Sequence, residues 1–108
     1  LSYGVLNVRF FNISNRPGDM LMDTLGAAAF GVPDVQLHFQ TLEPADVSRF
    51  LFNTGVYLVQ HGDVIQDGHT LTGIDGQSKW PCRHEEALAA PERAVVDVGA
   101  GDRPPTQD

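Results

Sequence analysis

A chain of 108 residues with 42% hydrophobic content has room for one domain with a modest core. Its 14 acidic and 7 basic residues give a formal net charge of -7, which argues against nucleic acid and against an anionic membrane surface as partners. The single cysteine, Cys82, excludes an intrachain disulfide and favours a cytoplasmic location, and no apolar run approaches the roughly 18 residues of a membrane-spanning helix.

The ends of the chain differ in composition from its middle. The first residues are Leu1-Ser2-Tyr3, with no initiator Met, and we expect either the C-terminal part of a longer protein or a trimmed form of it. We expect one α+β domain over residues 1–98. The last residues, 99–108, are rich in glycine, proline and charged or polar side chains, and we expect a disordered tail there because they cannot bury apolar surface.

Two segments in the first half of the chain predict strands. Residues 5–13 are rich in β-forming side chains that alternate between two faces. Residues 34–40 alternate strictly, with Val35, Leu37 and Phe39 on one face and polar side chains on the other. A sheet covered on one side by helices leaves its other side in water, which is the simplest explanation of this alternation.

Between these strands the sequence predicts a turn and a short helix. Residues 15–19 predict the turn, because proline fixes φ and glycine tolerates a positive φ. Residues 24–30 predict about two helical turns. Asp23 or Thr24 is the expected N-cap, and Gly31 fits the left-handed position after the last turn.

The strongest helical pattern spans residues 44–61. Pro44 fits the first helical position, Asp46 suits the positive end of the helix dipole, and Gly62 fits the C′ position. Apolar side chains recur at spacings of three and four along the segment, so that one face, including Leu51 and Leu58, can lie on a sheet.

The second half of the chain predicts shorter strands. Residues 64–65 and 70–72 are candidate short strands, residues 74–79 form a polar loop, and residues 94–98 are a β-branched, apolar last strand. The predicted fold is therefore an α+β two-layer sandwich. Its sheet is mixed or antiparallel with about 4–5 strands, and it carries one long helix and one short helix.

Five sequence pieces together resemble a known family. In chain order they are Met22-Asp23-Thr24-Leu25-Gly26, Phe30-Gly31-Val32-Pro33-Asp34-Val35-Gln36-Leu37-His38-Phe39, Asp67-Gly68-His69-Thr70-Leu71-Thr72-Gly73, Trp80-Pro81-Cys82-Arg83-His84-Glu85-Glu86 and Pro91-Glu92-Arg93. As a set they are similar to the bacterial domain of unknown function numbered 4261. The resemblance supports the domain boundaries and implies no activity, cofactor or site residue.

Candidate catalytic and metal-binding side chains do not form a familiar motif. The available nitrogen and sulfur ligands lack the paired spacings of structural zinc sites, so we expect no metal and no cofactor; they are His38, His61, His69, Cys82 and His84. A Cys-His-Asp set of Cys82, His38 or His84, and Asp34 would need an electropositive niche that keeps the thiol ionised. Arg83 favours such a niche, but two neighbouring glutamates oppose it.

The polar face of the sheet is the candidate binding surface. Arg9, Asp34, Gln36 and His38 share this face if the first two predicted strands are neighbours, and Trp80 is expected to flank it. Arginine and tryptophan are favoured anchors of protein interfaces.

These features lead to two alternative functions. The first is a non-enzymatic protein-interaction module of bacterial origin, an accessory or immunity-type protein that binds another protein. The second is a small-ligand-binding or hydrolytic domain that uses the polar face and Cys82. We also expect a homodimer, because exposed strand edges and the aromatic residues Phe10, Phe11 and Trp80 favour pairing.

Overall fold

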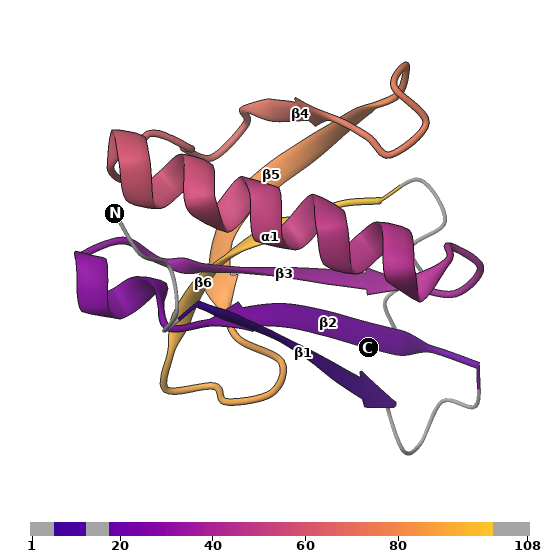
Figure 1. The fold of residues 1–108 in the computed structure, drawn as a ribbon, viewed down its shortest axis with the longest axis horizontal. Helices are drawn as coiled ribbons and strands as arrows, with labels where there is room; N and C mark the ends of the chain where they lie inside the picture. Colours follow the sequence, from indigo (N-terminus) through magenta and orange to yellow (C-terminus); the bar gives the residue numbers. More distant parts are fainter. Residues whose placement is uncertain (1–5, 13–17, 101–108) are drawn as a thin grey trace.

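The computed structural model describes residues 6–12 and 18–100 (Figure 1). The elements are, in chain order, β1 (Asn7–Asn12), β2 (Met20–Leu25), a 3₁₀ turn (Ala27–Phe30), β3 (Asp34–Phe39), α1 (Pro44–His61), β4 (Thr70–Thr72), β5 (Lys79–Glu86) and β6 (Ala94–Val98). Most of the predicted turn at residues 15–19 and of the predicted tail at residues 99–108 lies outside the described residues. Within the described ranges, no helix is long and apolar enough to cross a membrane.

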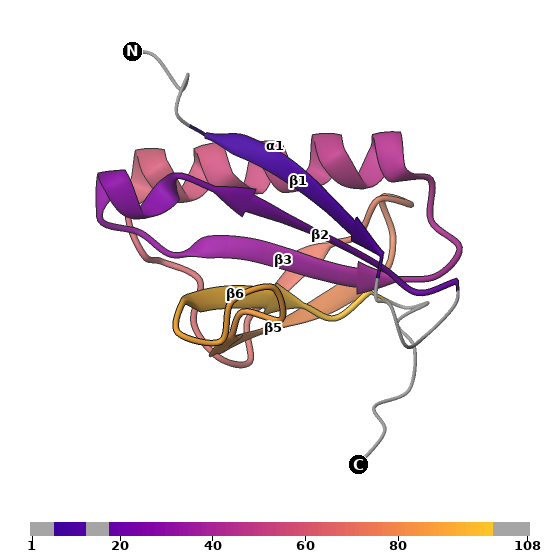
Figure 2. The ribbon, with the colours of Figure 1, turned by 90° about the horizontal axis from the view of Figure 1, so that it is seen from below.

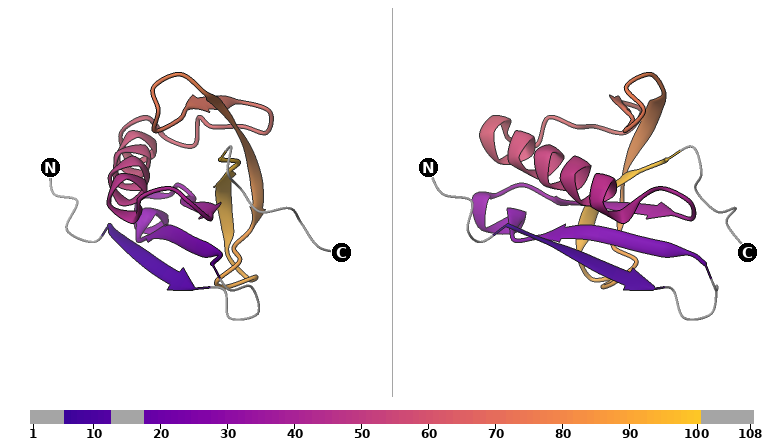
Figure 3. Two further views of the ribbon diagram at one scale, coloured as in Figure 1. Left: turned by 90° about the vertical axis from the view of Figure 1, so that its right-hand side faces the viewer. Right: turned by 45° about the vertical axis from the view of Figure 1, so that its right-hand side comes forward.

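The strands form one mixed sheet in the order β1-β2-β3-β6-β5-β4. All neighbouring pairs are antiparallel except β3 and β6, which are parallel. The sheet curls around α1, which lies on its concave side (Figures 2 and 3). The predicted α+β fold is therefore confirmed, with six strands where about 4–5 were expected.

Helix α1 begins and ends where the sequence predicts. Pro44 occupies the first turn, and Gly62 ends the helix at a φ of 84° with its N–H donating to the carbonyl of Leu58 at 2.7 Å. Leu51 and Leu58 are fully buried in one apolar cluster with the core-facing side chains of β3. The helix packs mainly against β1, β2, β3 and the 3₁₀ turn, which is one half of the curled sheet.

The predicted short helix over residues 24–30 is largely wrong. Met20–Leu25 is strand β2, and only Ala27–Phe30 turns, as a 3₁₀ segment that Gly26 precedes. Neither expected N-cap acts as one. The Asp23 carboxylate pairs with Arg9 across the sheet, and the Thr24 hydroxyl bonds within the sheet layer. These partners are distant in sequence, and they override the local helical tendency.

Strand β5 (Lys79–Glu86) is absent from the sequence-based expectations, whereas residues 64–65 were expected to be a strand and are part of a connection. Pro81 explains why β5 is hard to predict, because proline removes a ladder donor. The Pro81 carbonyl still accepts a hydrogen bond of 2.8 Å from the N–H of Gly99, which lies just beyond the end of β6. The predicted last strand at residues 94–98 is confirmed as β6, and its central place explains its apolar sequence.

Candidate functional site

The structure brings four of the five predicted site residues onto the convex face of the sheet. Arg9 lies opposite Asp23, Asp23 opposite Gln36, and Gln36 opposite Asp97, so these side chains form one row across four strands. Contrary to the expectation of a water-exposed face, the members that β3 contributes are buried; they are Asp34, Gln36 and His38.

The polar side chains of this row form two hydrogen-bonded pairs, Arg9 with Asp23 and Gln36 with Asp97. Arg9 makes two parallel hydrogen bonds to Asp23, from Nε to Oδ1 at 3.0 Å and from Nη2 to Oδ2 at 2.9 Å. The bond to Asp23 and its negative charge raise the pKa of the Arg9 guanidinium. Gln36 donates to Asp97 at 3.0 Å and accepts from the Leu88 N–H at 3.0 Å. The hydrogen bonds of both pairs are thus made within the chain.

Asp34 and His38 also have partners within the chain. Asp34 Oδ1 accepts from the Thr24 hydroxyl at 2.9 Å and from the Ala27 N–H at 3.0 Å, which fixes the connection between β2 and β3. His38 Nε2 lies 3.5 Å from the carboxylate of Asp19. These contacts explain the burial of the polar side chains of β3, and a binding role for them stays a prediction.

Trp80 does not join the other four predicted residues. It is only 5% exposed, belongs to the core cluster, and meets Phe50 of α1 edge to face with ring centroids 5.4 Å apart. A β-carbon on Gly73 would lie 2.5 Å from its indole ring, so the glycine makes room for this side chain. Trp80 is therefore a packing residue on the concave side.

The residues of the hydrolytic alternative do not converge. Cys82 is fully buried on the core face of β5, whereas His38 points to the opposite face of the sheet. The other candidate, His84, places its ring Nε2 against the Ile65 carbonyl at 2.7 Å. Burial and the negative charge of Asp97 raise the pKa of the Cys82 thiol to about 11, so it stays protonated at neutral pH. Among the residues that the structure describes, no three His, Cys, Asp or Glu side chains gather as a metal site.

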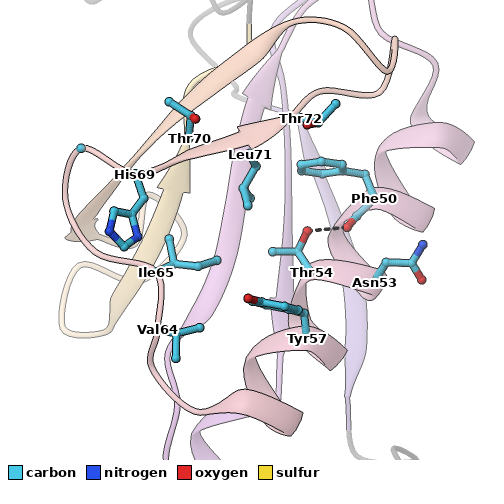
Figure 4. A pocket seen from close by; sticks show the side chains of 11 residues that line it. Phe50, Asn53, Thr54, Tyr57, Val64, Ile65, His69, Thr70, Leu71 and Thr72 are labelled. Carbon is cyan, nitrogen blue, oxygen red and sulfur yellow. Dashed lines mark hydrogen bonds between the residues drawn. The ribbon is translucent and has the colours of Figure 1, made fainter.

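The structure shows a groove that sequence reasoning missed. It lies between α1 and β4 and has a volume of about 640 Å³ (Figure 4). Phe50, Thr54 and Tyr57 of α1 face Leu71 of β4 and the apolar pair Val64 and Ile65 of the preceding connection across this hollow. The groove exists because α1 packs on the β1–β3 half of the sheet, while the other half curls over the helix.

The lining of the groove is accessible and carries no carboxylate, lysine or arginine. Tyr57 is 46% exposed and Val64 is 41% exposed, although both are large and mostly apolar. Charged groups lie at its two ends: Asp63 directly precedes Val64, and at the other end Lys79 Nζ donates to the Thr72 hydroxyl at 3.1 Å. The groove thus combines large apolar side chains with neutral polar ones, and it has a negative group at one end and a positive group at the other.

The connection that forms one wall of the groove is held against β5 by His84. The His84 ring Nε2 lies 2.7 Å from the carbonyl oxygen of Ile65, and its backbone N–H donates to the Asp67 carboxylate at 2.6 Å. The Gln66 N–H donates to His69 Nδ1 at 3.2 Å, which leaves the proton of a neutral His69 ring on Nε2. These bonds give the wall a defined position.

A weak signal for the groove exists in the sequence. Phe50, Asn53 and Tyr57 recur at spacings of three and four, beside the buried stripe of α1 rather than within it. The opposite wall has no such signal, since it depends on how the connection and β4 return to the helix.

The fold defines an α+β domain with one curled, six-stranded mixed sheet and a single long helix. The family model described as Domain of unknown function (DUF4261) matches residues 23–99, which is more than half of the chain, and the chain belongs to this family. No curated protein and no solved structure matches the chain.

Proposed function

We propose that the chain is a non-enzymatic protein-interaction module and that the groove between α1 and β4 is its contact surface. The observation that carries this proposal is the exposure of large apolar side chains around one hollow, notably Tyr57 and Val64. Exposed apolar patches rimmed by polar residues mark interaction sites, because their hydration is unfavourable until a partner covers them.

The convex face supports the proposal by contrast. Arg9 already donates hydrogen bonds to Asp23, and Gln36 donates one to Asp97. A partner that binds these side chains would have to displace those internal bonds. The groove requires no such exchange. Binding there removes apolar surface from water and leaves the buried hydrogen-bonded pairs intact.

The hydrolytic or small-ligand alternative has weaker support. Its nucleophile, Cys82, is buried and protonated, and His38 lies on the other face of the sheet. The volume of the groove, about 640 Å³, is in the range of small-molecule pockets, but the groove contains no charged side chain that would orient a polar substrate.

The proposal extends to an accessory or immunity-type protein of bacterial origin that acts in the cytoplasm. A small acidic domain can block or tether another protein through a single groove, without catalytic side chains. The negative charge of the chain, formally -7, would speed its encounter with a basic partner. Self-association stays an alternative, in which a second copy covers the exposed apolar surface.

The test compares two aromatic residues of equal exposure at different places. Tyr57 lines the groove, Phe10 lies on β1 at the other edge of the sheet, and each is 46% exposed. Partners are captured on the immobilised chain from the cells that produce it, and each captured protein is purified and titrated by calorimetry. We expect binding to Tyr57→Ala to weaken by about tenfold or more, since interface aromatics are common hot spots, and binding to Phe10→Ala to be unchanged. Equal binding by both variants would refute a role for the groove.

A further inference from the structure

Within residues 6–12 and 18–100, no strand pairs with the outer edge of β4, which lies beside the groove. In the β4–β5 ladder, Cys82 N–H donates to the His69 carbonyl at 2.8 Å and Gly73 N–H donates to the Ser78 carbonyl at 2.8 Å. Hydrogen-bonded positions alternate in antiparallel ladders. The backbone N–H and C=O of Leu71 therefore point toward β5, whereas those of Thr70 and Thr72 point outward.

Pro81 is consistent with this assignment. It lies opposite Thr70 and has no N–H. A residue at a non-hydrogen-bonded position donates no N–H to the partner strand, so proline removes no bond of the β4 ladder. In the described part of the chain, β5 is the only strand that pairs with β4, so β4 is an edge of the sheet. The edge is short, as exposed edges in soluble proteins tend to be.

The groove and the edge together fit an extended peptide. A strand added to the outer edge of β4 would lie between β4 and α1, since the groove occupies that space (Figure 4). Alternate side chains of such a strand point to one face, and those that face the hollow would meet Phe50, Tyr57 and Leu71.

The charges at the rim indicate the composition of the peptide. The side chain of Asp63, next to Val64, is 45% exposed even though its carboxylate lies 3.8 Å from His84 Nε2, and the net charge of the whole chain is -7. A lysine or arginine at that end of the peptide would be attracted, while the uncharged lining selects apolar side chains in the middle.

We propose that the groove binds an extended segment of a partner protein, which adds a strand to β4, places an apolar side chain between Phe50, Tyr57 and Leu71, and carries a basic residue at the Asp63 end. The inference rests on the proposed function, because it names the occupant of the same groove. Main-chain bonds to Thr70 and Thr72 provide affinity, and the hollow and Asp63 provide specificity.

The probe is a displayed library of linear peptides of about twelve residues, longer than β4 because each strand residue spans about 3.3 Å. It is selected on the full chain, and the best binder is synthesised with a fluorescent label and titrated by anisotropy. We expect the selected peptides to share an apolar residue and a lysine or arginine. Asp63→Asn should weaken binding by about threefold, the range of one exposed charge pair. Asp46→Asn, where the carboxylate is also 45% exposed, should leave binding unchanged.

Proline at position 72 tests the strand addition itself. Thr72→Pro removes an outward N–H without removing a β5 ladder bond, and Thr72→Val is the control for the lost hydroxyl contact with Lys79. We expect Thr72→Pro to weaken binding by about tenfold relative to Thr72→Val. A second measurement leaves the chain unaltered: methylation of alternate peptide nitrogens should abolish binding in one register and preserve it in the other. If the proline variant does not fold, the methylated peptides alone test whether a strand is added to β4.

The outcomes separate the inference from the proposed function. If Tyr57→Ala abolishes peptide binding while Thr72→Pro and both methylated peptides bind normally, the groove binds side chains without strand addition, and the inference is overturned alone. If no linear peptide is selected but light scattering shows a dimer that Tyr57→Ala dissociates, the occupant is a second copy and the inference is again overturned. If peptides bind and Tyr57→Ala has no effect, both the inference and the proposed function fail.

Discussion

Arg9→Leu should destabilise the domain although Arg9 is partly exposed. The reason is its partner, because Asp23 is 0% exposed and its two carboxylate oxygens accept the two hydrogen bonds from the guanidinium. Without Arg9 the carboxylate would stay buried next to Gln36 with its main cationic partner gone. The substitution therefore leaves a desolvated charge without compensation.

The structure sets the size of this effect. Removing one partner of a buried ion pair costs about 3–5 kcal/mol. The Arg9 side chain is 33% exposed, so water already screens part of its charge and can reach the carboxylate after truncation. We therefore expect a loss of about 2–3 kcal/mol, close to that of breaking hydrogen bonds to a charged group. The stacking of Arg9 over Phe11, at 5.0 Å from the ring centroid, adds a smaller loss of about 0.5 kcal/mol.

The assay is urea unfolding followed by the fluorescence of Trp80, the single tryptophan, which is 5% exposed. Arg9→Leu, Asp23→Leu and the double variant form a double-mutant cycle. The double variant should be more stable than Arg9→Leu alone, because it removes the buried charge together with its partner. Arg49→Leu is the control, since it breaks an exposed pair with Asp46 at 3.4 Å and should cost under about 0.5 kcal/mol.

Two results would refute this reasoning. An Arg9→Leu loss no larger than that of Arg49→Leu would mean that the Asp23 carboxylate is adequately solvated in the folded protein. Strictly additive losses in the cycle would mean that the two side chains do not interact, whatever their distance.

Three further predictions concern the concave side. Leu58→Ala should cost about 2–5 kcal/mol in urea unfolding, the range for a packed leucine, and a loss under about 1 kcal/mol would remove α1 from the core. Gly73→Ala should displace the Trp80 ring, cost about 1–3 kcal/mol and shift the emission of the folded protein to longer wavelength, so an unchanged spectrum and melt would contradict the packing. Because burial raises the pKa of the Cys82 thiol to about 11, the folded state keeps a proton that the unfolded chain releases from about pH 9 upward. Stability should thus fall by roughly 2–3 kcal/mol between about pH 8 and about pH 11, and an equal fall in Cys82→Ala would show that other groups cause it.

Helix α1 could be predicted because its signals are local. Pro44, Gly62 and the apolar spacing around Leu51 and Leu58 lie within the helix or next to it. Strand β2 could not be predicted, because the fate of Asp23 depends on Arg9 and Gln36, which lie on other strands. The local sequence favours Asp23 as a helix N-cap, but its pairing with Arg9 in the sheet outweighs that tendency.

The candidate site shows the same limit. Alternation correctly placed Arg9, Asp34, Gln36 and His38 on one face, but alternation does not reveal whether a polar face meets water or bonds to itself. Trp80 looked like a surface anchor and packs over Gly73 instead, a contact that sequence spacing cannot show. The groove was missed because its two walls come from α1 and from the return of the chain to β4.

The parallel pairing of β3 with β6 links the buried hydrogen-bonded pairs to the groove. After β3 the chain must cross the sheet before β6 can run in the same direction, and α1, β4 and β5 all lie in this crossover. The helix takes the concave face of the first half of the sheet, and the β4–β5 hairpin extends the sheet beyond β6. The Arg9–Asp23 pair joins β1 to β2 and the Gln36–Asp97 bond joins β3 to β6, whereas the seam between α1 and β4 keeps an open edge. Under the proposed function, stability and binding would be carried by different parts of the sheet, and a partner would occupy the seam without disturbing the buried charges.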